Sequence, residues 1–482
     1  MADARSAGCG LVALALLPCC STGRPAEKSA APRPTVTGAS PDFDASARRV
    51  RTLLEQLVAA DTENPPGNEA RAAAIGAARL QAAGISHQVF EFAPGRQNLI
   101  ARIKGNGSAK PLLLVAHTDV VPTAGQSWTS PPHRLTEKDG YLVGRGTTDD
   151  LSDAALDLEV LLLLQEHKIP LRRDVIVAWT GDEERGGEGI HWQLQHHPEA
   201  FNDAALALNE GGSVEIDAAG KGKSAAVHVA EKIYQDFSIR ARGKSGHSSR
   251  PVPDNAIYKL AGALRRLGEY RFPPRFLPVT RAFFLATADS EKPAIGAAMR
   301  TLASAGGELP RDALNALDEN PAIASLLRTT CVATQLAGGT GPNVLPAEAK
   351  ANVNCRILPD ETVEGTRRRL QEIAGDSVEV VAEASFGGSP PIPTAGEGPA
   401  AIEAVTHRFF PGIPVVPYMS NFVTDSRQLR AAGILSYGFS GMALTDEEAS
   451  RAHGADERIP AAALRRAVEM TWALVVALAG AQ

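Results

Sequence analysis

Three apolar runs in this chain each end directly in acidic or imidazole side chains. The runs and the residues that follow them are Leu112–Ala116 before His117-Thr-Asp119, Val175–Thr180 before Gly181-Asp-Glu-Glu184, and Ala205–Leu208 before Asn209-Glu210. Apolar runs of this kind are typical of buried strands in an α/β sheet. Charged groups are rarely left at the ends of buried strands unless they are paired or bound to metal. Because sites collect at the carboxyl ends of parallel strands, we expect these side chains to meet.

Helix-like and strand-like segments alternate around these runs. Residues 44–60 and 68–83 have the apolar spacing of helices, and Gly84 marks the end of the second one. Residues 152–167 form a strongly apolar helix between two of the buried strands. The alternation predicts an α/β fold with a mixed, largely parallel sheet sandwiched by helices.

The pattern changes near Glu231 and returns after Pro393. Between them, the strand expected at 234–242 alternates as a strand with one exposed face should. We expect a helix that starts at Pro253 and runs over 253–268, further strands at 329–336, 348–358 and 377–383, and a helix at 363–373. Residues 270–328 are expected to be a helical insert without an assigned role. The sequence therefore predicts an α+β domain at 232–386 that is inserted into a first domain. The first domain is formed by residues 42–231 and 387–482, and its last element is an apolar helix at 460–479.

The N-terminal forty residues differ from the rest. The apolar run Leu11–Leu17 is far shorter than the roughly 20 residues of a membrane-spanning helix, and it fits a signal peptide over residues 1–21. Residues 22–41 are expected to be a linker. We therefore expect export to the periplasm or the cell exterior, either as a free chain or with a lipid anchor on Cys19 or Cys20. A start assigned too far upstream, followed by a disordered leader, is the other interpretation.

Charge and cysteine content restrict the class of protein. The net charge is −6 without a long basic stretch, which argues against nucleic acid as the main partner. No CxxC pair occurs, so a zinc ribbon is excluded. Cys331 and Cys355 both lie in strand-like runs, and we expect two buried thiols there, with a disulfide between facing strands as the alternative.

The ionisable groups have the composition of a metal centre. Taken alone, each motif has an ordinary explanation: Asp149-Asp150 could cap a helix, Glu183-Glu184 could be a solvated turn, and His453 could be a surface histidine. Together, two imidazoles and several carboxylates are what a pair of zinc-like ions requires. We assign His117 as a ligand and Asp119 as the carboxylate that orients its ring.

In combination, these motifs resemble those of a known family. The matching segments are His117-x-Asp119, Gly144-Arg-Gly-x-x-Asp149, Asp182-Glu183-Glu184, Asn209-Glu210 and His453-Gly-x-x-Glu457, with Asn64-Pro-Pro-Gly before them. Their order and spacing resemble the co-catalytic di-zinc metallopeptidase superfamily of glutamate carboxypeptidase, aminoacylase, acetylornithine deacetylase, succinyl-diaminopimelate desuccinylase and carnosinase, from about Val50 to the C-terminus. Within that superfamily the chain most resembles the carboxypeptidase S branch, through Asn343-Val-Leu-Pro346, Asn354-Cys-Arg-Ile-Leu-Pro359 and Thr424-Asp-Ser-Arg427.

The resemblance implies a role for each matched residue. It implies two Zn²⁺ ions, for which Co²⁺ or Mn²⁺ can substitute, in a catalytic domain made of 42–231 and 387–482. The implied roles are as follows: Asp149 bridges the ions, His117 and Glu210 hold one, Glu184 and His453 hold the other, Glu183 is the general base and acid, His247 stabilises the oxyanion, and Asn343 and Arg356 hold the substrate carboxylate. It also implies a cis peptide at Asp149-Asp150, and an inserted lid domain through which relatives form dimers and supply His247 to the neighbouring subunit.

The function implied is hydrolysis of a peptide or N-acyl amide bond next to a free carboxylate. The alternatives are a carboxypeptidase or dipeptidase and an aminoacylase-type amidohydrolase, followed by a non-catalytic binding protein with the same fold. Two departures from the family pattern, Leu151-Ser152 and Gly438-Phe-Ser-Gly441, affect the shape of the pocket. The second also lacks the final glycine of a serine-hydrolase nucleophile elbow, and no HExxH motif is present.

Overall fold

The computed structural model describes residues 40–201, 203–385 and 387–481. The expected signal peptide, both candidate lipid-anchor cysteines and most of the expected linker lie outside the described residues. Within them, no helix has the length and apolar character needed to cross a membrane.

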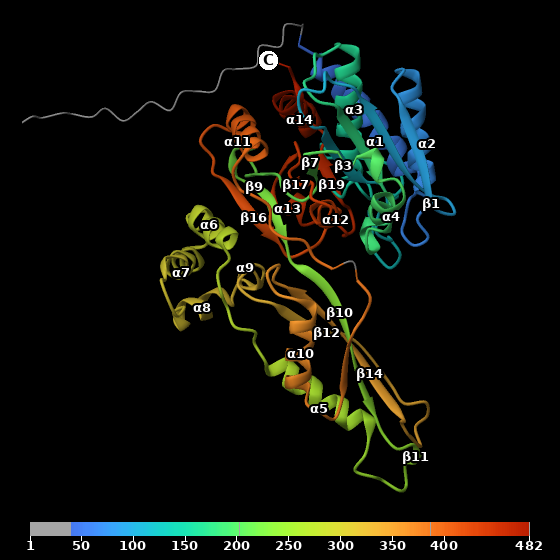
Figure 1. The fold of residues 1–482 in the computed structure, drawn as a ribbon, viewed down its shortest axis with the longest axis vertical. Coiled ribbons are helices and arrows are strands. Elements are labelled where there is room, and N and C mark those ends of the chain that lie inside the picture. The colour runs from blue at the N-terminus through green and yellow to red at the C-terminus, as the bar shows by residue number, and fades with distance from the viewer. Residues whose placement is uncertain (1–39, 202, 386, 482) are drawn as a thin grey trace, which may run out of the picture. The chain divides into compact units, whose positions relative to one another are not determined.

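A ten-stranded mixed sheet forms the centre of the first domain (Figure 1). Its strands, in spatial order, are β1 (His87–Ala93), β2 (Arg96–Ile103), β6 (Val175–Thr180), β3 (Leu112–His117), β7 (Leu206–Asn209), β17 (Leu435–Gly438), β9 (Gly222–Glu231), β8 (Val214–Ile216) and β18 (Ala443–Leu444), with β16 (Val415–Ser420) paired to β9. The central strands β6, β3, β7 and β17 run parallel. The expected fold class is therefore confirmed, and the strands β3, β6 and β7 end on one edge of the sheet.

Helices bury both faces of this sheet. On one face, the interior-facing residues of β3 join a core with α1 (Phe43–Ala59), α3 (Leu151–Glu166) and α14 (Ala463–Ala479). On the other face, Leu113 and Val115 pack with residues of α4 (Glu188–His196) and α12 (Ser426–Ala431). Every side chain of β3 is buried, because the period-two alternation of a strand sends successive residues to opposite faces that are both covered.

The inserted domain contains a separate antiparallel sheet, which we call the lid sheet. It consists of β12 (Thr330–Gly338), β14 (Glu348–Ile357), β10 (Ile233–Arg242) and β15 (Glu379–Ala382) in that order, backed by α5 (Ala256–Glu269) and α10 (Val363–Ala374). Alternate residues of β10, such as Phe237 and Ile239, lie in the core beneath these helices. Asn255 caps α5 by accepting hydrogen bonds from two backbone N–H groups, so this helix begins three residues after the expected start at Pro253.

The segment 270–328 is helical, as predicted. It forms α6 (Pro278–Thr287), α7 (Pro293–Ser304), α8 (Arg311–Leu317) and α9 (Pro321–Ser325). Its buried residues, including Phe284 and Met299, belong to the core of the first domain, and α6 packs against β16. The insert therefore extends the first domain rather than the core of the lid sheet.

The expectation of two free thiols is wrong. Cys331 on β12 and Cys355 on β14 form a disulfide. The register explains it: the two residues lie directly opposite each other in an antiparallel pair, with their Cα atoms 4.1 Å apart. Sequence reasoning could place both cysteines on strands but could not assign the register between strands 24 residues apart.

Candidate metal centre and active site

The ionisable residues of the three motifs converge at the carboxyl ends of β3, β6 and β7. His117 is the last residue of β3, and Glu210 follows the last residue of β7. Glu183 and Glu184 lie in a one-turn 3-10 helix, Glu183–Arg185, after β6. The backbone at Asp182 has a φ of 67°, which turns the chain sharply at the strand end and brings both glutamates over the sheet edge.

Asp149 lies between the two imidazoles. One carboxylate oxygen, Oδ1, is 2.9 Å from His117 Nε2, and the other, Oδ2, is 3.0 Å from His453 Nε2. His453 Nε2 is also 3.1 Å from Glu184 Oε2, and His117 Nε2 is 3.8 Å from Glu210 Oε1. A cis peptide joins Asp149 to Asp150, as the family resemblance implied.

The donor atoms form two overlapping groups of metal-ligand size. Those of His117, Asp149 and Glu184 lie within 4.8 Å of one another, and so do those of His117, Glu183 and Glu210. Glu184 Oε1 is buried without a hydrogen-bond partner among the described residues. Two imidazoles and four carboxylates in such a space leave excess negative charge, which is the composition that a pair of divalent cations compensates.

The electrostatics of the protein groups agree with this excess. Burial raises the pKa of Glu183 well above its usual range, and repulsion from Glu210 adds to the effect. Hydrogen bonds to Asp149 and Glu184 raise the pKa of His453 to about 10. Burial lowers the pKa of His117, but Asp119 and Asp149 outweigh it, so that the net pKa lies well above the usual value. His117, His453 and, beside Glu183, the guanidinium of Arg427 supply positive charge to these carboxylates.

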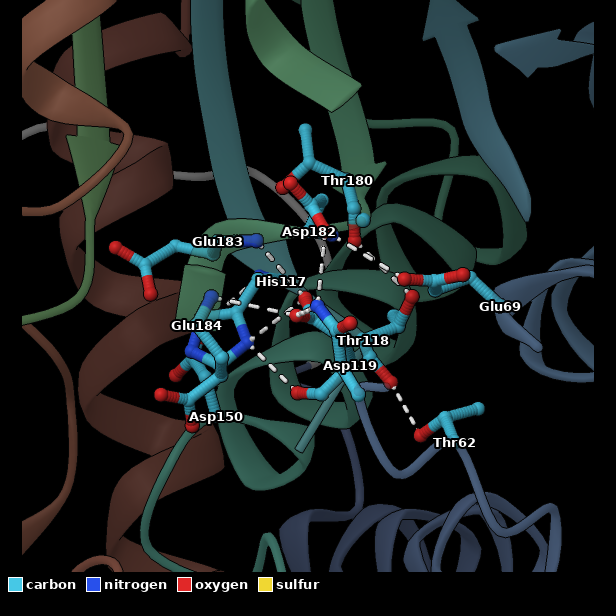
Figure 2. A network of polar contacts seen from close by, with 12 residues as sticks. Thr62, Glu69, His117, Thr118, Asp119, Asp150, Thr180, Asp182, Glu183 and Glu184 are labelled. Carbon is cyan, nitrogen blue, oxygen red and sulfur yellow. Dashed lines mark hydrogen bonds and ion pairs between the residues drawn. The ribbon is translucent and has the colours of Figure 1, made fainter. Parts of the chain in front are cut away.

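Asp119 fixes the loop that carries the two glutamates (Figure 2). Its carboxylate accepts hydrogen bonds from the backbone N–H groups of Glu183 at 3.1 Å and Glu184 at 3.3 Å. His117 Nδ1 lies 2.9 Å from the carbonyl oxygen of Asp119 and 3.6 Å from its Oδ1. Asn64, from the Asn64-Pro-Pro-Gly turn, donates to Asp119 Oδ2 at 2.8 Å. Asp119 therefore orients the histidine ring mainly through its carbonyl, and its side chain positions Glu183 and Glu184.

Glu457 is a positioning residue to which sequence reasoning gave no role. Its buried carboxylate accepts hydrogen bonds from the backbone N–H groups of Gly146, Thr148 and Asp149, at 3.1, 2.7 and 3.0 Å. It also pairs with Arg145 at 2.6 Å. The segment after His453 thus holds the loop that presents Asp149. The signal was present in the motif His453-Gly-x-x-Glu457, but the role could not be assigned without the partner atoms.

A cavity of about 790 Å³ opens over these residues. Its charged and polar lining includes Glu183, Glu184, Glu210 and His453, and from the lid sheet Tyr234, Asp236 and Arg356. Its apolar lining comes from Ala384, Phe422, Val423, Met442, Leu444, Ala449 and Ala452. Arg356 lies over the Tyr234 ring at 4.6 Å and donates to the Asn421 carbonyl at 3.2 Å. The cavity is therefore large enough for a small two-part substrate, with an arginine and an apolar surface in its walls.

His247 and Asn343 do not line this cavity. They lie close together, because His247 ends β11 (Gly246–His247), which pairs with β13 (Val344–Leu345), and Ser248 N–H donates to the Asn343 carbonyl. In Figure 1, β11 lies at the end of the lid sheet remote from the start of β10. The ten residues of β10 alone span about 30 Å at the usual rise per residue. These two candidates are therefore placed together, but away from the other candidate residues of the same chain.

Comparison with known proteins agrees with this geometry. The model of the peptidase family M20/M25/M40 matches residues 113–477. The chain is 29% identical over 398 residues to N-fatty-acyl-amino acid synthase/hydrolase PM20D1 from Homo sapiens, covering 81% of this chain and 78% of the relative. It is 27% identical over 387 residues to probable carboxypeptidase S-like 2 from Dictyostelium discoideum, covering 78% and 74%.

A solved structure of an M20 family protein has the same fold. The crystal structure of the M20 family metallo-carboxypeptidase Sso-CP2 from Sulfolobus solfataricus superimposes with a TM-score of 0.68 at 18% identity, covering 89% of this chain and 98% of the other. At this identity the likeness concerns the fold alone. The family match spans β3 to α14 and includes the ends of β3, β6 and β7 where the ionisable residues converge. The chain belongs to the M20/M25/M40 peptidase family, whose members act on peptide or N-acyl amino acid bonds.

Proposed function

We propose that this protein is a di-zinc hydrolase that releases a free amino acid from an N-acyl amino acid, with Glu183 as the general base. The observation that carries the proposal is the convergence of His117, Asp149, Glu184, Glu210 and His453 below a cavity that also contains Arg356 and an apolar surface. Cleavage of a C-terminal peptide bond by the same centre is the second candidate, because it requires the same free carboxylate beside the bond.

The protein groups fit the proposed ions. His117, Asp149 and Glu210 would hold one Zn²⁺, and Asp149, Glu184 and His453 the other, with Co²⁺ or Mn²⁺ as substitutes. Zinc in catalytic sites is bound by imidazole nitrogen and carboxylate oxygen atoms. Glu184 Oε1, which has no hydrogen-bond partner among the described residues, is available as such a ligand atom. When bound, such ions lower the pKa of a water molecule and polarise the amide carbonyl.

Glu183 is suited to proton transfer. Its backbone N–H is held by Asp119, and its carboxylate lines the cavity. We expect it to take a proton from the attacking water and to pass it to the leaving amine as the bond breaks. Its pKa is raised by burial, which places it nearer to the range of a group that can both accept and release a proton.

Arg356 would hold the substrate carboxylate. It is the lid-sheet arginine that lines the cavity, and a guanidinium binds a carboxylate through paired N–H donors. The acyl group would then lie against Phe422, Met442 and Leu444. This apolar surface and the similarity to N-fatty-acyl-amino acid synthase/hydrolase PM20D1 favour an apolar acyl group over a polar peptide.

His247 and Asn343 would act across a dimer. Their distance from the site of their own chain supports delivery to the site of a second subunit, with His247 as donor to the oxyanion and Asn343 near the substrate carboxylate. The lid sheet offers a surface for this: β12 is an edge strand, and Val332, Leu336 and, on α5, Tyr258 are 63%, 71% and 74% exposed. Exposed apolar side chains on an unpaired edge favour a homodimer through the lid.

The disulfide supports export. Disulfides form and persist mainly in oxidising compartments, so the Cys331–Cys355 bond favours a periplasmic or extracellular protein. Membrane attachment would then depend on a lipid anchor in the leader, at Cys19 or Cys20.

The decisive experiment is a substrate panel on the zinc-loaded protein, before and after chelation. We expect release of free amino acid from N-fatty-acyl and N-acetyl amino acids to exceed that from dipeptides, and to be lost on chelation and restored by zinc. Glu183→Gln should lower kcat about 10²–10⁴-fold with unchanged zinc content. Glu188→Gln, an exposed acid five residues away, is the matched control and should keep wild-type activity.

Three outcomes would overturn the proposal in whole or in part. Hydrolysis that persists at an unchanged rate in Glu183→Gln would remove the general base. A zinc-loaded protein that hydrolyses none of these substrates would favour a non-catalytic binding protein. Preference for dipeptides over N-acyl amino acids would select the second candidate function.

A further inference from the structure

A second, much smaller cavity lies beside the active-site cavity. Its volume is about 20 Å³, and its lining includes Asp153 and Asp157 on α3, Ser440 from the loop after β17, and Thr471 on α14. A space of this size holds about one water molecule or one small ion. Asp153 and Ser440 also line the active-site cavity, so the two cavities share a wall.

The two aspartates of this cavity have little compensation. They lie one helical turn apart, so their side chains are on the same face of α3. Asp153 accepts a hydrogen bond from Ser440 Oγ at 2.6 Å. Among the described residues, Asp157 has no hydrogen-bond partner, and neither aspartate forms an ion pair with a lysine, arginine or histidine. Burial and repulsion from Asp153 raise the pKa of Asp157 well above its usual range.

Thr471 is a second, independent sign of a ligand. The residue is 7% exposed, and its hydroxyl is buried without a hydrogen-bond partner among the described residues. The hydroxyl is directed at the loop that lines the cavity, because a Cβ atom added at Gly441 would lie 2.2 Å from Thr471 Oγ1. A buried hydroxyl without a partner is costly, and a bound ion or water in the cavity would satisfy it.

We propose that this cavity is a binding site for a hard cation of the size of Ca²⁺ or Na⁺, held by Asp153, Asp157, Ser440 and Thr471. All of these donors are oxygen atoms, which hard cations prefer, and a cation supplies the positive charge that the protein does not. Mg²⁺ fits less well, because it keeps several water molecules that a cavity of this volume does not accommodate. The site is distinct from the zinc centre and does not depend on the proposed function.

The bound cation would stabilise one wall of the active-site cavity. It would connect α3, α14 and the loop of Ser440, which come from both sequence segments of the first domain. We therefore expect a cation requirement for stability that remains when zinc is already saturating.

Thermal unfolding of the full chain at a fixed, saturating zinc concentration tests this. Four chloride solutions of equal ionic strength are compared: CaCl₂, MgCl₂, NaCl and choline chloride. If the ion is Ca²⁺, we expect Tm in CaCl₂ to be higher than Tm in MgCl₂. If it is Na⁺, we expect Tm in NaCl to be higher than Tm in choline chloride. In either case the difference should be roughly 3 °C when the cation is at a hundredfold its Kd. If the ion is Ca²⁺, elemental analysis should find one calcium per chain in addition to zinc.

Two variants separate a cation site from a merely structural role. Asp157→Asn should abolish the cation-specific shift and also raise Tm in choline chloride, because it removes one of two uncompensated charges. Thr471→Val keeps both charges and should reduce the shift. Glu166→Gln, an acid on the same helix with a side chain 62% exposed, should keep the wild-type shift.

A wild-type protein without any cation-specific shift, as for a cavity that holds only water, overturns the proposal. So does a shift that is unchanged in Thr471→Val, which also decides the matter if Asp157→Asn does not fold.

Discussion

The first domain and the lid differ in the kind of group that lacks a partner. In the first domain these groups are charged, and in the lid they are apolar. The edge of the central sheet concentrates half-buried acidic groups, Asp149, Glu183, Glu184 and Glu210, around two imidazoles. The lid sheet exposes apolar surface on its edge strand β12, where Leu336 is 71% exposed. Clustered acidic groups with little access to water favour bound cations, whereas exposed apolar surface favours contact with another protein surface.

The two regions also contribute different groups to the proposed active site. The first domain contains all the proposed metal ligands and Glu183, the proposed general base. The lid contains Arg356, which lines the cavity of its own chain, and His247, which does not. The lid therefore has a near end that lines the cavity of its own chain and a far end that, under the proposed function, would serve another subunit.

Among the tests of this division between the two regions, the largest effect should come from His247. His247→Ala should lower kcat about 10²–10³-fold, the usual loss for one oxyanion donor, with unchanged zinc content. Co-expression with Glu183→Gln should restore about a quarter of the wild-type activity, because half of the dimers would then contain one complete site. Steady-state hydrolysis and analytical ultracentrifugation measure both.

If His247 acts within its own chain, the mixed dimers should gain no activity. Leu336→Asp on the exposed edge of β12 is the control: it should leave the protein monomeric and prevent the restoration.

The next effect concerns the stability of the lid alone. Replacing both Cys331 and Cys355 by serine should lower the free energy of unfolding of the lid by about 3 kcal/mol, because the bond closes a loop of 24 residues in the unfolded chain. Denaturant unfolding, followed by hydrogen exchange of β12 and β14, measures it. A reducing agent should reproduce the effect in the wild type and change nothing in the double variant. Equal loss of protection in the central sheet would contradict the separation of the two regions.

A smaller effect is expected at the metal centre from Glu457. Glu457→Gln should weaken zinc binding about 10–100-fold, because the loop that presents Asp149 loses its anionic acceptor. Competition with a chelator measures the Kd. Glu447→Gln is the matched control, since Glu447 is 66% exposed and pairs with Arg451 and Arg458. An unchanged Kd would mean that the loop keeps its geometry without Glu457.

The last effect, small for each pH unit, concerns pH and the first domain only. Burial, with the nearby Arg430, lowers the pKa of His228 to about 3 from its usual 6.5. Between these values the unfolded state binds more protons, so stability should fall as pH falls, by about 1.4 kcal/mol per pH unit. His228→Phe, which matches the aromatic neighbours Tyr418 and Phe422, should remove this slope in denaturant titrations. The exposed His196→Gln should retain it, and equal slopes in all three proteins would refute the assignment.

Much of the site could be predicted because its residues follow buried strands. The apolar runs before His117, Glu183 and Glu210 fixed both the strands and the edge at which they end. Asp149 and His453 depended on the family motifs, since a helix cap and a surface loop have the same local sequence. Their geometry agrees with the expected centre, while their roles remain a proposal.

What could not be predicted depends on contacts between distant segments. Glu457 acts through backbone N–H groups more than 300 residues earlier in the chain. The disulfide required the register of β12 on β14, and the cation site required α3 and α14 to pack side by side. Local periodicity contains no information on such pairings.

The insertion of the lid between two parts of the first domain has a consequence for biosynthesis. His117, Asp149, Glu183, Glu184 and Glu210 leave the ribosome well before His453 and Glu457, which follow the lid in the sequence. The nascent chain thus presents a set of acidic side chains that stays unfinished until the lid and the last segment have been synthesised. Metal loading is therefore expected to be a late event that follows the folding of the whole polypeptide.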